Sequence, residues 1–221
     1  EYGAGKWSSL MSLEILVVDD SALLRRVECD IINSDNKFKV TDTCKDGLEA
    51  LEKLRTKKYD GVVLDINMPR MDGLELLQQL QKEKIKANIV MASTLTVEGA
   101  NEAIKSLELG AIDFVTKPSN IIEAKGDAFK KALLDVLYAA TKARVHFKKP
   151  SLVVAADKTA AASVNRLKKP GQNKIIAIAS STGGPKALQS VITKIPADID
   201  APVVLVQHMP AGFTRSMAAR L

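Results

Sequence analysis

Four short apolar segments in the first 120 residues of the chain each end in residues with polar side chains. The segments cover residues 13–18, 59–64, 88–92 and 112–116. Helix-length segments with amphipathic spacing separate them, and this alternation predicts a parallel sheet with helices on both faces. Sheets of this kind carry their functional residues at the carboxyl ends of their strands. We therefore expect the chain to begin with a doubly wound α/β domain whose site lies at one edge of the sheet.

The polar residues at those four strand ends favour phosphoryl chemistry. They are Asp19 and Asp20, Asp65, Ser93 and Thr94, and Lys117. Carboxylates that lie close together repel one another, and oxygen ligands of this kind suit Mg²⁺. Asp65 follows a central strand and is placed to attack a phosphoryl group. Lys117 is placed to pair with the added charge, and a hydroxyl of Ser93 or Thr94 to donate to a phosphoryl oxygen.

A second group of residues lies near the end of the chain and favours acyl transfer. The isoleucine-rich run 174–179 predicts a buried strand, and residues 180–185, Ser-Ser-Thr-Gly-Gly-Pro, predict a sharp turn into a helix. A second apolar run, 201–206, leads to His208. A serine, free backbone N–H groups and a histidine at one sheet edge supply a nucleophile, an oxyanion site and a base. The alternative is a glycine-rich turn beside a surface histidine, and spacing alone leaves both open.

Residues 13–119 resemble the receiver domain of response regulators, which has a flavodoxin-like fold. The resemblance is carried by Asp19-Asp20, by Asp-Ile-Asn-Met-Pro at 65–69 and by Lys117-Pro118. It implies that Asp65 is the phosphoacceptor and that the phosphoryl group contacts Ser93, Thr94 and Lys117. The groups expected to hold Mg²⁺ are the carboxylates of Asp19, Asp20 and Asp65 and the backbone carbonyl of Asn67.

Residues 173–221 resemble the start of the catalytic domain of the CheB-type chemotaxis protein-glutamate methylesterases, a second doubly wound, Rossmann-like α/β domain. Ser181 matches the family's nucleophile because it directly precedes Thr-Gly-Gly, and His208 matches the triad histidine. The turn expected to bind the oxyanion is Thr182, Gly183 and Gly184. One departure is Ala179, where the family usually has glycine.

The resemblance also implies a third catalytic residue, an aspartate that the family carries farther downstream than Leu221. Asp198 and Asp200 precede the second strand of this unit. Six strand residues at roughly 3.3 Å each place them about 20 Å from His208. Asp157 lies in the segment between the two units. The triad aspartate is therefore missing, and we expect the 221-residue chain to be inactive as an esterase.

Composition divides the chain into four segments. Residues 1–10 are a tag or upstream segment, and 11–145 are the receiver with a last helix at about 121–145. Residues 146–172 are a basic flexible linker, and 173–221 are the start of the catalytic domain. The formal net charge is +6, and the positive excess follows the receiver. Basic linkers are commoner than nucleic-acid-binding arms, so we expect no specific nucleic-acid partner.

Three classes of function are compatible with a receiver domain at the start of a chain. The resemblance implies a phosphorylation-regulated enzyme that hydrolyses glutamyl methyl esters on chemoreceptors and deamidates receptor glutamines, with a chemotaxis histidine kinase as phosphodonor. The alternative is a stand-alone receiver module or phosphate sink without catalytic activity. A DNA-binding regulator is disfavoured because no helix-turn-helix pattern follows the linker. The chain has no long apolar run and no signal pattern, which predicts a cytoplasmic protein without membrane insertion.

The family resemblance implies that the receiver covers the catalytic cleft until phosphorylation shifts the two domains. We predict that the receiver face in this contact is the one carrying Ser93, Thr94 and the helix that follows them. A hydroxyl that turns toward a phosphoryl group would report the modification on that face.

Overall fold

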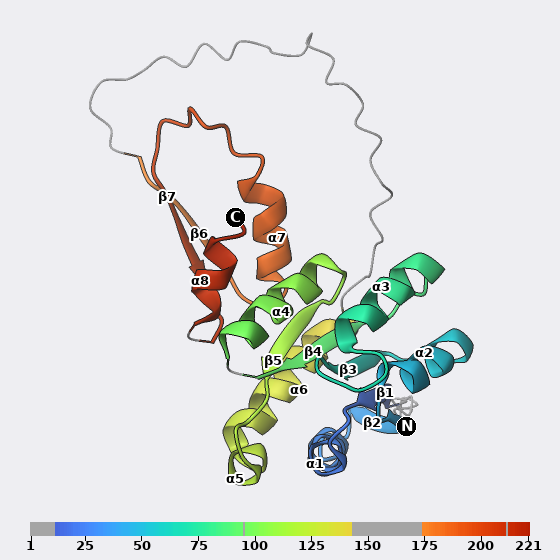
Figure 1. Ribbon diagram of the computed structural model, residues 1–221. Coiled ribbons are helices and arrows are strands. Elements are labelled where there is room, and N and C mark those ends of the chain that lie inside the picture. Colours follow the sequence, from blue (N-terminus) through green and yellow to red (C-terminus); the bar gives the residue numbers. More distant parts are fainter. Residues whose placement is uncertain (1–11, 95, 143–173, 211) are drawn as a thin grey trace, which may run out of the picture.

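The computed structural model describes residues 12–94, 96–142, 174–210 and 212–221, which form two α/β units (Figure 1). The predicted linker and residues 1–10 lie outside the described residues. Within the described parts of the chain, no helix is long and apolar enough to cross a membrane.

The first unit is a parallel five-stranded sheet with the strand order β2-β1-β3-β4-β5. Its strands are β1 Leu13–Val18, β2 Phe38–Cys44, β3 Gly61–Asp65, β4 Ile89–Ser93 and β5 Asp113–Thr116. Its helices are α1 Ala22–Asn33, α2 Gly47–Thr56, α3 Gly73–Glu83, α4 Val97–Glu108, α5 Ile121–Ala124 and α6 Asp127–Lys142. The predicted doubly wound, flavodoxin-like fold is confirmed.

Both faces of this sheet are buried, which explains why its central strands are apolar without alternation. Along β1, Leu16 and Val18 pack in the cluster that includes residues of α2, α3 and α4. Ile15 and Val17 pack in the opposite cluster with residues of α1 and α6. The two cores fix the strands in place, so the loops at their carboxyl ends are held at one edge of the sheet.

Two features of this unit differ from the sequence prediction. The strand β2 was not predicted, because only its end residues Phe38 and Cys44 are buried and the residues between them are mostly polar. The single helix predicted over 121–145 was wrong, since the structure has α5 and α6 separated by Lys125 and Gly126. Glycine is a poor helix former, and Asn120 caps the short α5 separately.

The second unit contains a two-stranded parallel sheet and two helices. The strands are β6 Ile176–Ser180 and β7 Val203–Gln207, and the helices are α7 Gly184–Ile192 and α8 Phe213–Ala218. Ser180 pairs in register with Gln207, so both strands end at the same edge. Gly183 has a φ of 72°, a left-handed conformation that glycine adopts without strain, and Pro185 lies in the first turn of α7.

The two units pack against each other on the α4 side of the receiver, where Figure 1 shows α7 and α8 lying close to α4. Phe114 of β5 stacks on Phe213 of α8, with ring centroids 4.8 Å apart and an angle of 13° between the planes. Phe213, Met217 and Leu188 belong to the same apolar cluster as Ile104 of α4. The contact therefore includes the helix after Ser93 and Thr94, as predicted.

Candidate functional site

The polar residues at the receiver's sheet edge converge as predicted. Asp19 and Asp20 follow β1, Asp65 ends β3, and one carboxylate oxygen from each lies within 4.8 Å of the others. Lys117 follows β5, and its Nζ lies 2.6 Å from Asp19 Oδ2 and 2.8 Å from Asp65 Oδ2. The cluster therefore combines the candidate phosphoacceptor Asp65, two further acidic groups and one cation.

The charges in this cluster fit a divalent cation. Burial raises the pKa of Asp65 to about 6, although the ammonium of Lys117 opposes the rise. Burial acts to lower the pKa of Lys117, but the charges of Asp65 and Asp19 outweigh it and raise that pKa. A single ammonium cannot neutralise three carboxylates. Their closely spaced oxygens are the ligand type that Mg²⁺ prefers, so the residues present fit this ion.

The two hydroxyl residues do not contact Asp65 in the described structure. The buried Ser93 donates from its Oγ to the backbone oxygen of Gly99 in α4, 2.8 Å away. Thr94 is exposed, with its Oγ1 3.3 Å from Thr96 Oγ1. The Asn67 side chain donates to Glu102 of α4 at 3.4 Å, which leaves its backbone carbonyl as the predicted cation ligand. To contact a phosphoryl group, the Ser93 hydroxyl would therefore have to break its hydrogen bond to the Gly99 backbone oxygen in α4.

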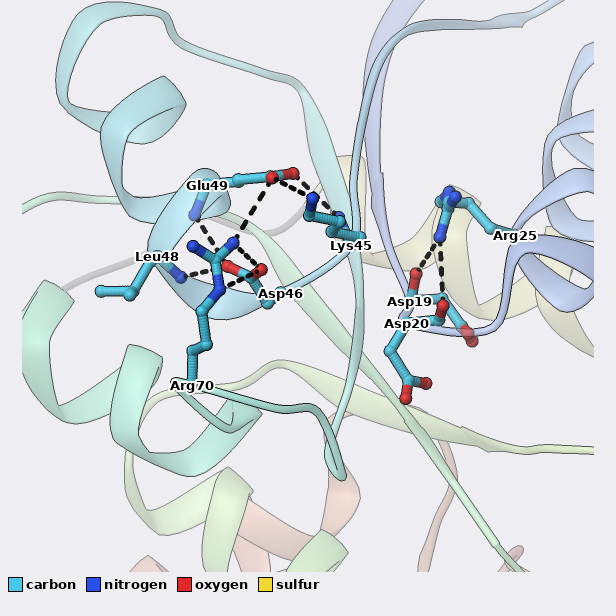
Figure 2. A network of polar contacts seen from close by, with 8 residues as sticks. All are labelled: Asp19, Asp20, Arg25, Lys45, Asp46, Leu48, Glu49 and Arg70. Atoms are coloured by element: carbon cyan, nitrogen blue, oxygen red, sulfur yellow. Dashed lines mark hydrogen bonds and ion pairs between the residues drawn. The ribbon is translucent and has the colours of Figure 1, made fainter.

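Two residues of α1 contribute to this site and were not predicted. Arg25 donates from Nη1 to the backbone oxygens of Asp19 at 2.5 Å and Asp20 at 3.5 Å, and so braces the acidic pair (Figure 2). Glu28 is buried on the sheet-facing side of the same helix. Burial, together with the charge of Asp19, raises the pKa of Glu28 to about 8. The sequence signal for a buried Glu28 is its position on the same helix face as the apolar residues Leu24, Ile31 and Ile32.

The loop between β3 and α3 is tied to the start of α2 by Arg70 (Figure 2). Arg70 donates through Nε and Nη2 to the buried carboxylate of Asp46, with the Nε bond at 2.8 Å. Asp46 also caps α2 by accepting from the backbone N–H groups of Leu48 and Glu49. Arg70 reaches this position with a φ of 67°. The loop that follows Asp65 is therefore anchored at a second point.

The candidate catalytic residues lie together at the shared edge of β6 and β7. Ser181 Oγ lies 3.4 Å from His208 Nδ1, and both residues are exposed. Gln207, which was not predicted, accepts from Ser180 Oγ at 2.6 Å and donates to the backbone oxygen of Ser181 at 2.9 Å. A Cβ on Gly184 would lie 2.2 Å from Gln207 Oε1, so this position requires glycine. Gln207 thus holds the turn that carries the serine.

An aspartate of the receiver that the sequence does not point to, Asp113, reaches this turn. Asp113, at the start of β5, accepts at Oδ2 from the Gly183 N–H, 3.2 Å away. Asp157 lies outside the described residues. Asp198 and Asp200 precede β7, at the opposite end of that strand from His208.

Asp113 is buried beside the catalytic pair. Burial raises the pKa of its carboxyl, and the hydrogen bonds that it accepts and the nearby His208 imidazole oppose this rise. A cavity of about 470 Å³ lies at the contact between the two units, and its lining includes Ser181, Thr182 and His208 from one unit and Asp113 and Asp135 from the other. The candidate catalytic residues Ser181 and His208 therefore face a cavity whose lining is partly supplied by the receiver.

A parallel sheet with acidic residues after β1 and at the end of β3, and a lysine after β5, defines a response-regulator receiver domain. Residues 15–125 match the family described as the response regulator receiver domain. Residues 176–221 match the family described as CheB methylesterase. The chain therefore belongs to the response regulator receiver family, and its second unit resembles the CheB methylesterases.

Known proteins resemble the chain over both units. It is 42% identical over 211 residues to a protein-glutamate methylesterase/protein-glutamine glutaminase of Halalkalibacterium halodurans, covering 95% of this chain and 58% of that protein. A protein of the same name from Pyrococcus horikoshii is 42% identical over 213 residues, covering 95% of this chain and 56% of the relative. The chain therefore spans somewhat over half the length of these relatives.

A solved structure resembles the first unit. The response regulator domain of Thermotoga maritima CheB superposes with a TM-score of 0.52 at 38% identity, covering 60% of this chain and 98% of that structure.

Proposed function

We propose that this chain is the regulatory part and the first catalytic segment of a phosphorylation-controlled protein-glutamate methylesterase. The observation that carries the proposal is the placement of Ser181 and His208 at one sheet edge, next to a receiver with a complete acidic cluster. The names of the relatives support the same activity. The proposed partners are a chemotaxis histidine kinase and methylated chemoreceptors, and the proposed location is the cytoplasm.

The first reaction in this proposal is phosphorylation of Asp65. Its carboxylate oxygen attacks the phosphorus of a phosphohistidine or a small phosphodonor, and the bond to the leaving group breaks as the acyl phosphate forms. Lys117, already 2.8 Å from the carboxylate, pairs with the added charge. Asp19, Asp20, Asp65 and the Asn67 carbonyl would hold Mg²⁺, which supplies positive charge for the phosphoryl oxygens.

The second reaction is acyl transfer at Ser181. His208 accepts the proton from Ser181 Oγ as this oxygen attacks the carbonyl carbon of a glutamyl methyl ester. Backbone N–H groups of the turn stabilise the oxyanion, and His208 then gives its proton to the departing methanol. Water hydrolyses the acyl-enzyme by the same proton transfers and leaves a glutamate. The 3.4 Å between Oγ and Nδ1 is long for a catalytic bond, as is common without substrate.

Phosphorylation is tested by incubating the chain with a small phosphodonor and Mg²⁺. We expect Asp65→Asn to give no acyl phosphate, because the amide cannot act as the nucleophile. The matched control is Asp30→Asn, which changes an exposed aspartate on α1 and should be labelled as the unchanged chain is. Undiminished labelling of Asp65→Asn would refute the assignment.

Esterase activity is tested with two proteins, the chain itself and the chain joined to the remaining catalytic residues of the Halalkalibacterium relative. We expect methanol release from methylated receptors only by the joined protein, because the triad aspartate of the family lies in the added segment. Ser181→Ala should abolish that release, and Ser190→Ala on α7 should not. Disabling a triad carboxylate costs roughly 10⁴-fold in serine proteases. Robust Ser181-dependent hydrolysis by the short chain would contradict the need for a further aspartate.

The stand-alone receiver remains the second candidate function. It is favoured if Asp65 is phosphorylated while the joined protein releases no methanol.

The regulatory part of the proposal predicts that a phosphodonor changes hydrogen exchange on α4, α7 and α8. Changes confined to α1, on the opposite receiver face, would rule out this coupling.

A further inference from the structure

A carboxylate of the receiver occupies the catalytic turn of the other unit. Asp113 is only 8% exposed, and its two oxygens accept from two backbone N–H groups. Oδ1 accepts from the Phe114 N–H at 2.9 Å, within β5, and Oδ2 accepts from the Gly183 N–H at 3.2 Å, across the contact between the units. A buried carboxylate is costly unless donors surround it, so this placement requires the turn.

The donors that Asp113 uses belong to the turn expected to bind an oxyanion. Gly183 lies two residues after Ser181, and its N–H is one of the groups available to a negative oxygen at that site. The Thr182 side chain also forms a hydrogen bond with the Asp113 carboxylate, and the nearby His208 imidazole acts to lower the pKa of Asp113. A tetrahedral oxyanion and a carboxylate both present a negative oxygen to such donors. One N–H cannot serve both at full strength.

The neighbouring residues fix Asp113 in this position. Phe114 stacks on Phe213, so the start of β5 is held against α8. Arg220, after α8, pairs with Glu108 at the end of α4 at 2.8 Å. These contacts hold β5 and α4, and with them the backbone of Asp113, against the second unit.

We infer that Asp113 is an internal carboxylate ligand of the catalytic turn, which competes with substrate for the Gly183 N–H as long as the receiver is docked. The inference rests on the proposed function of Ser181 and His208. It assigns one side chain of the receiver to the site itself and makes the docked receiver resemble a bound product, since the reaction also ends in a carboxylate. Removing the Asp113 carboxylate should therefore free a donor without changing the catalytic residues.

The test is hydrogen exchange of individual backbone amides, measured by NMR on the 221-residue chain. We expect Asp113→Ala to speed exchange at Gly183 by about ten- to a hundredfold, the range for losing a bond to a charged acceptor. Asp113→Asn keeps the shape and loses the charge, so it should give a smaller acceleration. The Gly184 N–H, which donates to Ser181 O at 2.7 Å, is the internal control for an intact turn.

The matched control variant is Asp135→Asn, because Asp135 lines the same cavity from α6. It should leave exchange at Gly183 unchanged. Equal exchange at Gly183 in Asp113→Ala and the unchanged chain would overturn the inference. So would a change confined to the His208 ring resonances, which would mean that Asp113 acts on the imidazole instead.

The amide measurement requires no catalysis, so it separates this inference from the proposed function. In the joined protein, Asp113→Ala should raise methanol release in the absence of phosphodonor. A faster Gly183 exchange without any esterase activity would refute the esterase proposal and the competition with substrate, while leaving the contact in place. A loss of activity in Asp113→Ala would show that the carboxylate assists catalysis, and would overturn the competition.

Discussion

Replacing Glu28 with glutamine should make the receiver less sensitive to alkaline pH. Glu28 is 1% exposed, and neither of its carboxyl oxygens has a hydrogen-bond partner among the described residues. Burial, reinforced by Asp19, raises its pKa from 4.5 to about 8. Near neutral pH the folded protein therefore holds a proton on Glu28 that the unfolded chain has released.

The size of this effect follows from the two pKa values. Between pH 4.5 and 8 the folded state binds more protons than the unfolded state, so the free energy of unfolding decreases as the pH rises. The contribution is absent below 4.5, costs about 3 kcal/mol at pH 7 and levels off at about 5 kcal/mol above pH 8. Glu28→Gln has no proton to lose, and its own cost is independent of pH.

The assay is urea unfolding followed by far-UV circular dichroism at several pH values, with a chelator present to keep cations from the acidic cluster. The free energy of unfolding of Glu28→Gln relative to the unchanged chain should increase by about 3 kcal/mol between about pH 5 and pH 8. Asp30→Asn, an exposed change on the same helix, should show no such slope. A flat difference for Glu28→Gln would refute the reasoning, whatever its absolute value.

Three further outcomes are expected. Mg²⁺ affinity, measured by calorimetry, should weaken as the pH falls through about 6, because burial raises the pKa of Asp65 to about 6 and the proton competes with the cation. Phe213→Ala should remove the stack on Phe114 and speed amide exchange in α7 and α8, while the receiver strands keep their protection; unchanged exchange in both helices would contradict the packing role. Arg70→Ala should lower the free energy of unfolding in urea by about 1–3 kcal/mol, because it leaves the buried Asp46 carboxylate short of a donor. The control Arg26→Ala breaks an exposed ion pair and should cost well under 1 kcal/mol. Equal costs would show that the Arg70–Asp46 pair is no stronger than a surface pair.

The sequence predicted the receiver's sheet and its acidic edge because both depend on local order along the chain. An apolar strand followed by a polar residue places that residue at the sheet edge, and four such segments were enough to bring Asp65 and Lys117 together. The strand β2 was not predicted because an edge strand with mostly polar middle residues has no continuous apolar run. The break between α5 and α6 depends on one glycine, which a long amphipathic pattern conceals.

The contacts made by side chains distant in sequence could not be predicted. Gln207 holds the Ser181 turn through a bond across 26 positions, and Arg70 reaches Asp46 across 24. Glu28 was visible in the sequence as an acid on an apolar helix face, yet its closeness to Asp19 and Asp65 depends on how α1 packs on the sheet. These residues act through packing, which spacing alone does not specify.

Asp113 was not predicted because functional residues are expected at the carboxyl ends of parallel strands, and Asp113 lies at the amino end of β5. The carboxyl end of that strand leads to Lys117 and the phosphoacceptor, whereas its amino end normally contributes only to the core. Here the second unit covers the amino end, so Asp113 at one site and Lys117 at the other are four residues apart along β5. At about 3.3 Å per residue the separation is about 13 Å.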